Sequence, residues 1–302
     1  MALPTRPGTP GAALRGAGLD RVLPYLMLGP AIFLVLAVVV YPLFEGLRSS
    51  TGFFRFGRLV RSVGLDNYRQ AFDDPLFAQA LLTTARFVFL AVTIETVLGL
   101  GLALLLAREG RLVRRIRATL ILPMIVTPVV VGIVFRLIYA SDVGLLASLA
   151  HALGLSSPQI LSNGDGAFWG LVVLDVWEWT PLLFLILLAG IQSMPIEPFE
   201  AAKVDGASGW RTFVDHTLPL LRPTILVAVT LRAIEALTTF DQVYVLTRGG
   251  PGTSTQLISI YGYQTFFQFQ QVGYAAAMLF IVSLVVLLAS GFAIALMWRR
   301  GR

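Results

Sequence analysis

The chain has 302 residues, of which 56% are apolar and only 13% are charged. Soluble domains usually carry about a quarter charged residues, and the apolar runs here reach the roughly 20 residues that cross hydrocarbon as a helix. This composition excludes an ordinary soluble domain. The formal net charge is +6, but the arginines flank apolar segments, a pattern that sets membrane topology, so no nucleic-acid partner is expected.

The side chains that usually carry chemistry are scarce. The chain contains no cysteine, which excludes disulfides, thiolate catalysis and cysteine-ligated metals. His151 and His216 are isolated in predicted loops, so no metal site is expected. Since no nucleophile or acid–base pair gathers at a predicted membrane face, we expect no catalytic residue and no enzymatic activity.

The chain is predicted to be an all-α integral membrane protein with six transmembrane helices. Residues 1–20 are rich in Pro, Gly and Ala and are predicted to be a disordered cytoplasmic tail, followed by one membrane domain over residues 21–302. The first apolar run is too long for a signal peptide and is kept as a span. The predicted spans are residues 23–44, 81–107, 118–139, 168–191, 223–246 and 274–298.

The charges between the spans predict the orientation. Fourteen Lys or Arg residues lie on the side of the termini and six on the other side. Basic residues accumulate in cytoplasmic loops, so both termini are expected in the cytoplasm, in a multi-pass protein of a bacterial or archaeal plasma (inner) membrane.

The predicted cytoplasmic loop over residues 192–222 reads as two short helices with a turn between them. Residues 200–204 are good helix formers, and Gly206 is suited to end a helix. Ser208 is a plausible N-cap for a second helix, which Pro219 is expected to stop. Small residues let another protein approach closely, and the aromatic side chains Trp210 and Phe213 could fill a groove.

This loop resembles the Glu-Ala-Ala loop of binding-protein-dependent ABC importers. In that family the pattern continues with a glycine four residues after the second alanine and a Leu-Pro pair about a dozen residues later, and the loop forms a coupling helix in a groove of the ATP-binding subunit. The resemblance implies the same fold, with ATPase-coupling residues Glu200, Ala201, Ala202, Asp205, Gly206, Ala207, Trp210, Phe213, Leu218 and Pro219.

A second segment resembles the carbohydrate-type permeases, in particular the maltose and glycerol-3-phosphate first-permease branch. Residues 246–251 read Leu-Thr-Arg-Gly-Gly-Pro, and the segments 240–244 and 64–68 also fit the family. A plain turn leaving the fifth span would use the same Gly-Pro residues. The resemblance covers nearly the whole chain beyond the N-terminal tail.

The energy source is expected to lie on another subunit. The chain contains no G-x-x-x-x-G-K-[ST] motif, so it has no phosphate-cradling loop. We expect no cofactor on this chain, with ATP and magnesium on a partner ATPase. The resemblance implies two ATP-binding subunits, a second permease subunit in a probable heterodimer, an extracytoplasmic solute-binding protein, and the lipid around the spans.

Ionisable and aromatic residues inside the spans are the candidates for a substrate path. Charge in hydrocarbon is costly, so such residues are expected to face the interior of the bundle. Arg232 and Glu235 are three residues apart and are predicted to pair on one helix face. Aromatic rings stack on sugars and carboxylates accept their hydroxyls, which gives the candidates Asp175, Trp177, Glu178, Trp179, Asp241, Gln242 and Tyr244.

The sequence leaves alternatives open for the transported solute and for the energy source. Because the mid-span candidates are mostly acidic, a neutral sugar or polyol is favoured over glycerol-3-phosphate or a related organophosphate. A proton-coupled secondary transporter is the rival class, since Glu95, Asp175, Glu178 and Glu235 could form a proton relay. That alternative leaves the loop over residues 192–222 unexplained.

Overall fold

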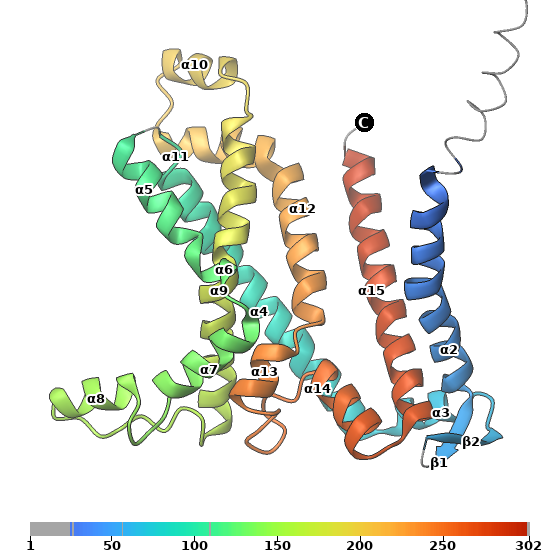
Figure 1. Ribbon diagram of the computed structural model, residues 1–302. Helices are drawn as coiled ribbons and strands as arrows, with labels where there is room; N and C mark the ends of the chain where they lie inside the picture. The colour runs from blue at the N-terminus through green and yellow to red at the C-terminus, as the bar shows by residue number, and fades with distance from the viewer. Residues whose placement is uncertain (1–24, 26, 56, 109, 301–302) are drawn as a thin grey trace, which may run out of the picture.

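The structure is a computed structural model that describes residues 25, 27–55, 57–108 and 110–300. It is mostly helical (Figure 1). The predicted tail, residues 1–20, lies outside the described residues. The elements are α2 (Tyr41–Ser50), β1 (Gly52–Arg55), β2 (Arg58–Ser62), α3 (Asp66–Asp73), α4 (Pro75–Leu105), α5 (Arg111–Leu120), α6 (Leu122–Ile125), α7 (Pro128–Ile138), α8 (Leu145–Ala152), α9 (Gly164–Gln192), α10 (Glu197–Val204), α11 (Gly209–Thr212), α12 (Leu218–Leu237), α13 (Asp241–Leu246), α14 (Ile258–Tyr263) and α15 (Val272–Arg300), with π-helical turns at Leu36–Val40, Phe213–Thr217 and Gln264–Gln268.

The centre of the molecule is the packing of α4 against α9, with α12 lying on both helices (Figure 1). The two backbones approach closely at Gly99 of α4, where an added Cβ would lie 3.0 Å from the backbone nitrogen of Phe184 and 3.1 Å from Cβ of Leu183. Small residues at such crossings let membrane helices pack tightly. Buried apolar side chains of α4, α9 and α12 cluster around this contact, Phe184 among them.

Three helices in the described part of the chain are long and apolar enough to cross a membrane: Met27–Ser50, Pro75–Leu105 and Gly164–Gln192. A fourth span is obtained if Arg111–Ile125 and Pro128–Ile138 count together, although they are bent by 95°. The predicted span over residues 118–139 is therefore not one continuous helix, because it is broken between Ile125 and Pro128. Thr127 has an extended backbone, ψ 139°, because the ring of a following proline disfavours helical angles.

The predicted fifth span ends earlier than residue 246. The helix α12 stops at Leu237, and α13 begins separately at Asp241. The hydroxyl of Thr238 donates to the carbonyl of Glu235 at 3.0 Å. Such local hydrogen bonds from threonine compete with the helical ladder, and they accompany the break.

A small β-hairpin corrects the expectation of an all-α fold. The antiparallel strands β1 and β2 pair Gly52 with Ser62 and Arg55 with Arg58. Gly57, in the connection, has φ +73°, a left-handed conformation that glycine adopts without steric cost. The hairpin and α3 lie at the end of the molecule opposite α10 (Figure 1).

The helices α2 and α15 form a pair at one side of the molecule (Figure 1). The pair is attached through α3, where the side-chain amide of Asn67 donates to the carbonyls of Ser50 and Gly52 at 2.8 and 3.0 Å. Most side chains of Met27–Ser50 are exposed, whereas α9 is largely buried. The molecule therefore consists of a central packed group of helices and an outer pair.

Candidate functional site

The turn after α10 has the geometry of a specific helix C-terminus. Gly206 adopts φ +71°. The amide of Ala207 donates to the carbonyl of Ala202 at 2.9 Å, and the amide of Gly206 donates to that of Lys203 at 3.1 Å. This pair of bonds defines a Schellman motif. The prediction that Gly206 ends the first helix is confirmed.

The second helix of the loop starts as predicted but does not end as predicted. The Ser208 hydroxyl accepts a hydrogen bond from the amide of Arg211 at 3.3 Å, which confirms the N-cap. Pro219, however, does not stop this helix. A π-helical turn at Phe213–Thr217 leads directly into α12, and Pro219 lies in the first turn of α12, where its missing N–H costs little.

The loop presents small and charged residues on its surface. Glu200, Ala201, Asp205 and Gly206 are exposed, whereas Ala202 is buried. Figure 1 shows α10 projecting beyond the other helices, on the same side as the C-terminal end of α15. The surface of α10 is therefore free to contact another protein.

An aromatic pair lies beside α10 at the start of α11. Trp210 is 74% exposed, and its ring centroid is 5.6 Å from that of Phe213. Ala207, Phe213, Leu218 and Pro219 are half-buried. A groove of about 810 Å³ separates the loop from α4. The side chains of Lys203, Ala207 and Trp210 line this groove together.

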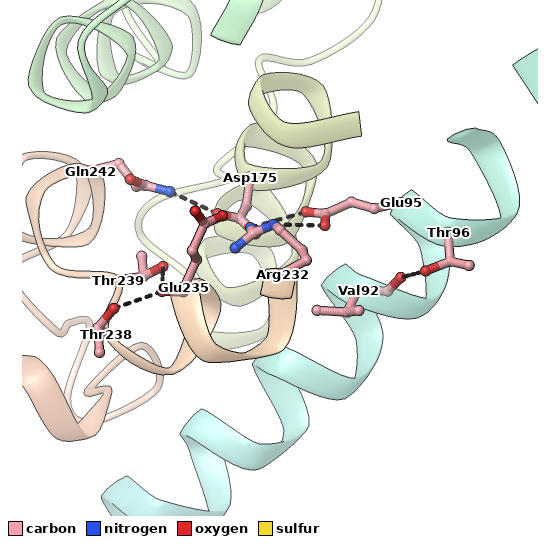
Figure 2. A network of polar contacts seen from close by, with 9 residues as sticks. All are labelled: Val92, Glu95, Thr96, Asp175, Arg232, Glu235, Thr238, Thr239 and Gln242. Carbon is pink, nitrogen blue, oxygen red and sulfur yellow. Dashed lines mark hydrogen bonds and ion pairs between the residues drawn. The ribbon is translucent and has the colours of Figure 1, made fainter. Parts of the chain in front are cut away.

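A buried ionic network joins four helices inside the central group (Figure 2). Arg232 of α12 binds Glu95 of α4 through two hydrogen bonds, Nε to Oε2 at 2.8 Å and Nη2 to Oε1 at 3.1 Å. The same guanidinium binds Asp175 of α9, whose other oxygen accepts a hydrogen bond from Gln242 of α13 at 2.7 Å. All four side chains are at most 3% exposed.

This network corrects the predicted pairing of Arg232 with Glu235. Arg232 forms ion pairs with Glu95 and Asp175, and Glu235 is absent from the ion pairs of the described residues. One oxygen each of Glu178 and Glu235 is buried without a hydrogen-bond partner among the described residues. Carboxylates therefore outnumber the single guanidinium.

The predicted substrate-path residues do not form a single cluster. Asp175 and Gln242 are bonded to each other, and the ring of Trp179 lies 5.2 Å from the Arg232 guanidinium. Trp177 is 47% exposed and packs on Phe135, and Asp241 is exposed in the first turn of α13.

Tyr244 belongs to a separate aromatic cluster. Its ring stacks on Phe240 with centroids 5.3 Å apart, and Tyr263 of α14 contacts both rings. Phe240, Tyr263 and Phe267 line a pocket of about 760 Å³ between the end of α12, α14 and α15, together with the hydroxyls of Thr238 and Ser259. Pockets of this size accept small organic ligands.

Several residues of these two clusters were not among the predicted site residues. Glu95 and Arg232 are 137 positions apart in sequence and meet only in the fold. The sequence feature that could have identified them is a charged side chain inside an apolar span, because such a charge requires a partner. Tyr263 lies in a short helix between spans and carried no such signal. No group of three or more His, Asp or Glu residues within the described chain could hold a metal ion.

Sequence comparisons with known proteins indicate a membrane component of a transport system. Residues 97–297 match the family model described as the binding-protein-dependent transport system inner membrane component. The chain is 34% identical over 263 residues to the sulfoquinovosyl glycerol transport system permease protein SmoG of Agrobacterium fabrum, covering 86% of this chain and 85% of that protein. It is 36% identical over 276 residues to the trehalose/maltose transport system permease protein MalF of Thermococcus litoralis, covering 89% and 91%.

The fold also matches a solved structure. A chain in the crystal structure of a bacterial alginate ABC transporter, in complex with an alginate pentasaccharide-bound periplasmic protein, superposes with a TM-score of 0.80. The sequence identity is 22%, and the match covers 92% of this chain and 94% of that chain.

Proposed function

The chain belongs to the family of binding-protein-dependent transport system inner membrane components, and from this premise we propose that it is the permease subunit of an ATP-driven carbohydrate importer. It forms half of a translocation path that opens alternately to the two sides of the membrane. The observation that carries the proposal is the projecting α10 loop, which has the small surface and the Gly206 turn suited to docking on a partner.

The proposed membrane topology has six spans with both termini in the cytoplasm. Its spans are Met27–Ser50, α4, the bent segment from α5 to α7, α9, α12 and α15. Two further observations support it. The α10 loop and the C-terminal end of α15 lie on one side (Figure 1), and basic residues are concentrated in the loops of that side.

The proposed partners follow from the family and from the lack of a phosphate-binding motif. Two ATP-binding subunits hold ATP and magnesium, and α10 docks on one of them. A second permease subunit completes the path, and an extracytoplasmic binding protein delivers the solute. Closure of the ATPase pair would move α10 and, with it, the helices α9 and α12 on either side of the loop, which is a rigid-body switch.

The proposed solute is a neutral sugar or polyol. The relatives are named for sulfoquinovosyl glycerol and for trehalose and maltose, and the pocket beside Phe240 and Tyr263 offers aromatic faces with hydroxyl groups at its edge. The surplus of carboxylates around Arg232 disfavours an organophosphate such as glycerol-3-phosphate. A proton-coupled transporter remains the alternative mechanism, and it predicts uptake that uncouplers abolish and vanadate leaves unchanged.

Gly206 provides the test of docking. An added Cβ would meet no atom of this chain within 4 Å, so within the chain a substitution acts on the backbone alone. A β-branched residue at φ +71° is strained by roughly 1–2 kcal/mol. Gly206→Val is expected to weaken ATPase association about tenfold and to reduce transport, measured by co-purification and by uptake into vesicles.

Two control variants isolate the backbone effect. Gly206→Asn should retain most association, because asparagine tolerates the left-handed region. Gly209→Ala should behave like the unmodified chain, since Gly209 has a negative φ and open space around it. If Gly206→Val keeps full association and transport, α10 is not the docking element.

The solute can be identified by measuring which compounds bind to the cognate binding protein. Thermal stabilisation of the cognate binding protein by a panel of neutral sugars, polyols and organophosphates should select a neutral carbohydrate, and ATP-dependent uptake of that compound should require this chain. Stabilisation by a phosphate ester alone would reject the proposed solute class.

A further inference from the structure

The β-hairpin of β1 and β2 concentrates positive charge on the proposed outer side of the membrane. Residues 52–62 contain three arginines and no Asp or Glu. Every residue of β2 is exposed, and within the described part of the chain neither Arg58 nor Arg61 forms an ion pair. The hairpin lies at the end of the molecule opposite α10 (Figure 1). Its positive charge is therefore open to a partner from outside.

A β-bulge places the three arginines on one face of the hairpin. The register pairs Phe53 with Arg61. After a shift of one residue it pairs Arg55 with Arg58. Cross-strand partners share a face, and residues two apart on one strand share it as well. Because Val60 is the extra residue of β2, Arg58 and Arg61 lie on the same face although they are three positions apart.

This arrangement is unfavourable for the hairpin by itself. Like charges directly opposite each other on paired strands repel, and Arg55 lies opposite Arg58. Membrane proteins also concentrate basic residues in their cytoplasmic loops, so arginines on the outer side oppose the orientation of the chain. An anionic partner would offset both effects. The three arginines are therefore better explained by binding than by local stability.

The hairpin is held firmly on its neighbours. The amide of Val63 donates to the carbonyl of Thr51 at 2.8 Å, which closes the base of the hairpin. Asn67 of α3 donates to the carbonyl of Gly52 at 3.0 Å. An added Cβ at Gly273, near the start of α15, would clash with the same carbonyl oxygen. Because its backbone is already fixed, the basic face loses little conformational entropy when a partner binds.

The chemistry of the face favours an acidic protein surface over lipid. The negative surface potential that attracts basic segments to membranes belongs to the cytoplasmic leaflet, whereas the hairpin is on the proposed outer side. Arginine and aromatic side chains are enriched in protein interfaces. Phe53 is 47% exposed, and its ring centroid is 5.8 Å from the Arg61 guanidinium. Among the proposed partners, the extracytoplasmic binding protein is the one that arrives from this side.

We propose that the face formed by Phe53, Arg55, Arg58 and Arg61 is a docking surface for an acidic region of the extracytoplasmic binding protein. This inference rests on the proposed binding-protein-dependent import. Opposite charges steer two proteins toward each other and speed their association, most strongly at low ionic strength. The hairpin thus raises the rate at which the loaded binding protein reaches the permease and takes no part in translocation itself.

The experiment measures ATP hydrolysis by the complex in nanodiscs as the concentration of its purified, solute-loaded binding protein increases. Arg58→Gln combined with Arg61→Gln removes two charges from the face. The control, Arg48→Gln combined with Arg69→Gln, removes two exposed arginines near the hairpin, which pair with carboxylates of their own helices at 3.6 and 3.8 Å. Both double variants change the net charge equally, but only the first changes the face.

The two double variants are expected to differ. The face variant should raise the half-saturating concentration of the binding protein about tenfold at an ionic strength of about 0.03 M, with the maximal rate unchanged. The increase should be smaller at about 0.15 M, where the Debye length is about 8 Å. The control should shift this concentration by less than about twofold, since exposed ion pairs contribute little. Arg58→Lys combined with Arg61→Lys keeps the charge and should retain most of the affinity.

Other results would overturn the docking surface. Equal shifts in both double variants would show only an effect of net charge, and no shift in either would mean that the face meets no acidic partner. A lower maximal rate at an unchanged half-saturating concentration would also contradict it. A shift that appears with phosphatidylglycerol in the nanodiscs and vanishes with phosphatidylcholine alone would assign the face to lipid headgroups. If the binding protein does not stimulate the unmodified complex, the proposed function fails instead.

Discussion

At the scale of single residues, the charged groups inside the spans are explained by their partners. Arg232 is 1% exposed, yet it forms bidentate bonds with Glu95 and a further bond with Asp175. A buried ion pair is favourable only with such geometry. Replacing one of its two partners is costly, because the charge of the other partner is then buried and unpaired. The stability of the central helices should therefore depend on the balance of charge in this network.

We expect Arg232→Met to destabilise the permease by about 3–5 kcal/mol, because it leaves two buried carboxylates without a cation. Thermal unfolding of the purified complex measures this effect. The triple variant Arg232→Met, Glu95→Met and Asp175→Asn should recover most of the loss, since it removes the charges and keeps an acceptor for Gln242. A triple variant less stable than the single one would contradict this account.

Asp74 gives a prediction about pH. Burial alone would raise the pKa of the Asp74 carboxyl, but the hydrogen bonds from Tyr261 at 2.5 Å, from Tyr274 and from the Leu76 amide lower its pKa below 3.8. A carboxyl with a lowered folded pKa stabilises fully above its ordinary pKa. Its contribution is lost as the pH falls through the lower folded pKa.

Stability is therefore expected to fall below about pH 4 in part through Asp74. Unfolding midpoints of the purified chain between pH 7 and pH 3 test this, with Asp74→Asn as the comparison. The variant should be less stable at pH 7 and should lose less stability on acidification. Parallel curves for the two proteins would show that Asp74 does not contribute.

At the scale of elements, the close approach of α4 and α9 depends on a glycine. Gly99 faces the backbone of α9, whereas Gly101, two residues later on the same helix, has no neighbour within 4 Å of an added Cβ. The two positions share the helix and the residue type, but Gly99 is buried at the crossing and Gly101 is half-buried at the groove beside the α10 loop. They therefore separate the effect of the crossing from the effect of helix propensity.

Gly99→Val is expected to destabilise the helix pair by about 1–3 kcal/mol through overpacking. Gly101→Val should be nearly neutral. The measurement is thermal unfolding of both variants in the same detergent, supported by expression level in the membrane. Equal losses at both sites would mean that the helices separate easily at Gly99.

At the scale of the whole molecule, the α10 loop and the α7–α8 connection lie at opposite ends (Figure 1). Val204 is 87% exposed in α10, and Val143 is 83% exposed between α7 and α8. The proposed topology places the first in the cytoplasm and the second outside.

With the chain produced without ATP-binding subunits, so that α10 is uncovered, a membrane-impermeant maleimide should therefore label Val143→Cys in intact cells and Val204→Cys only in inverted vesicles. The absence of native cysteine leaves no background on this chain. Labelling of both positions from the same side would reject the six-span topology.

Sequence alone determined the features that depend on local patterns. The apolar runs predicted the long helices α4 and α9. The glycine and serine of the loop predicted the end of α10 and the start of α11, and the motif around Glu200 pointed to the family. These features were accessible because helix length, capping and backbone conformation depend on residues close together in the chain.

Only the tertiary structure decided which charges meet and where helices break. Arg232 was expected to pair with Glu235 on its own helix and instead binds Glu95 and Asp175, which lie 137 and 57 residues away. The bend before Pro128 and the separation of α13 from α12 likewise appeared only in the fold. The physical reason is that a buried charge takes the partner that packing brings within hydrogen-bond distance, and sequence spacing does not specify that packing.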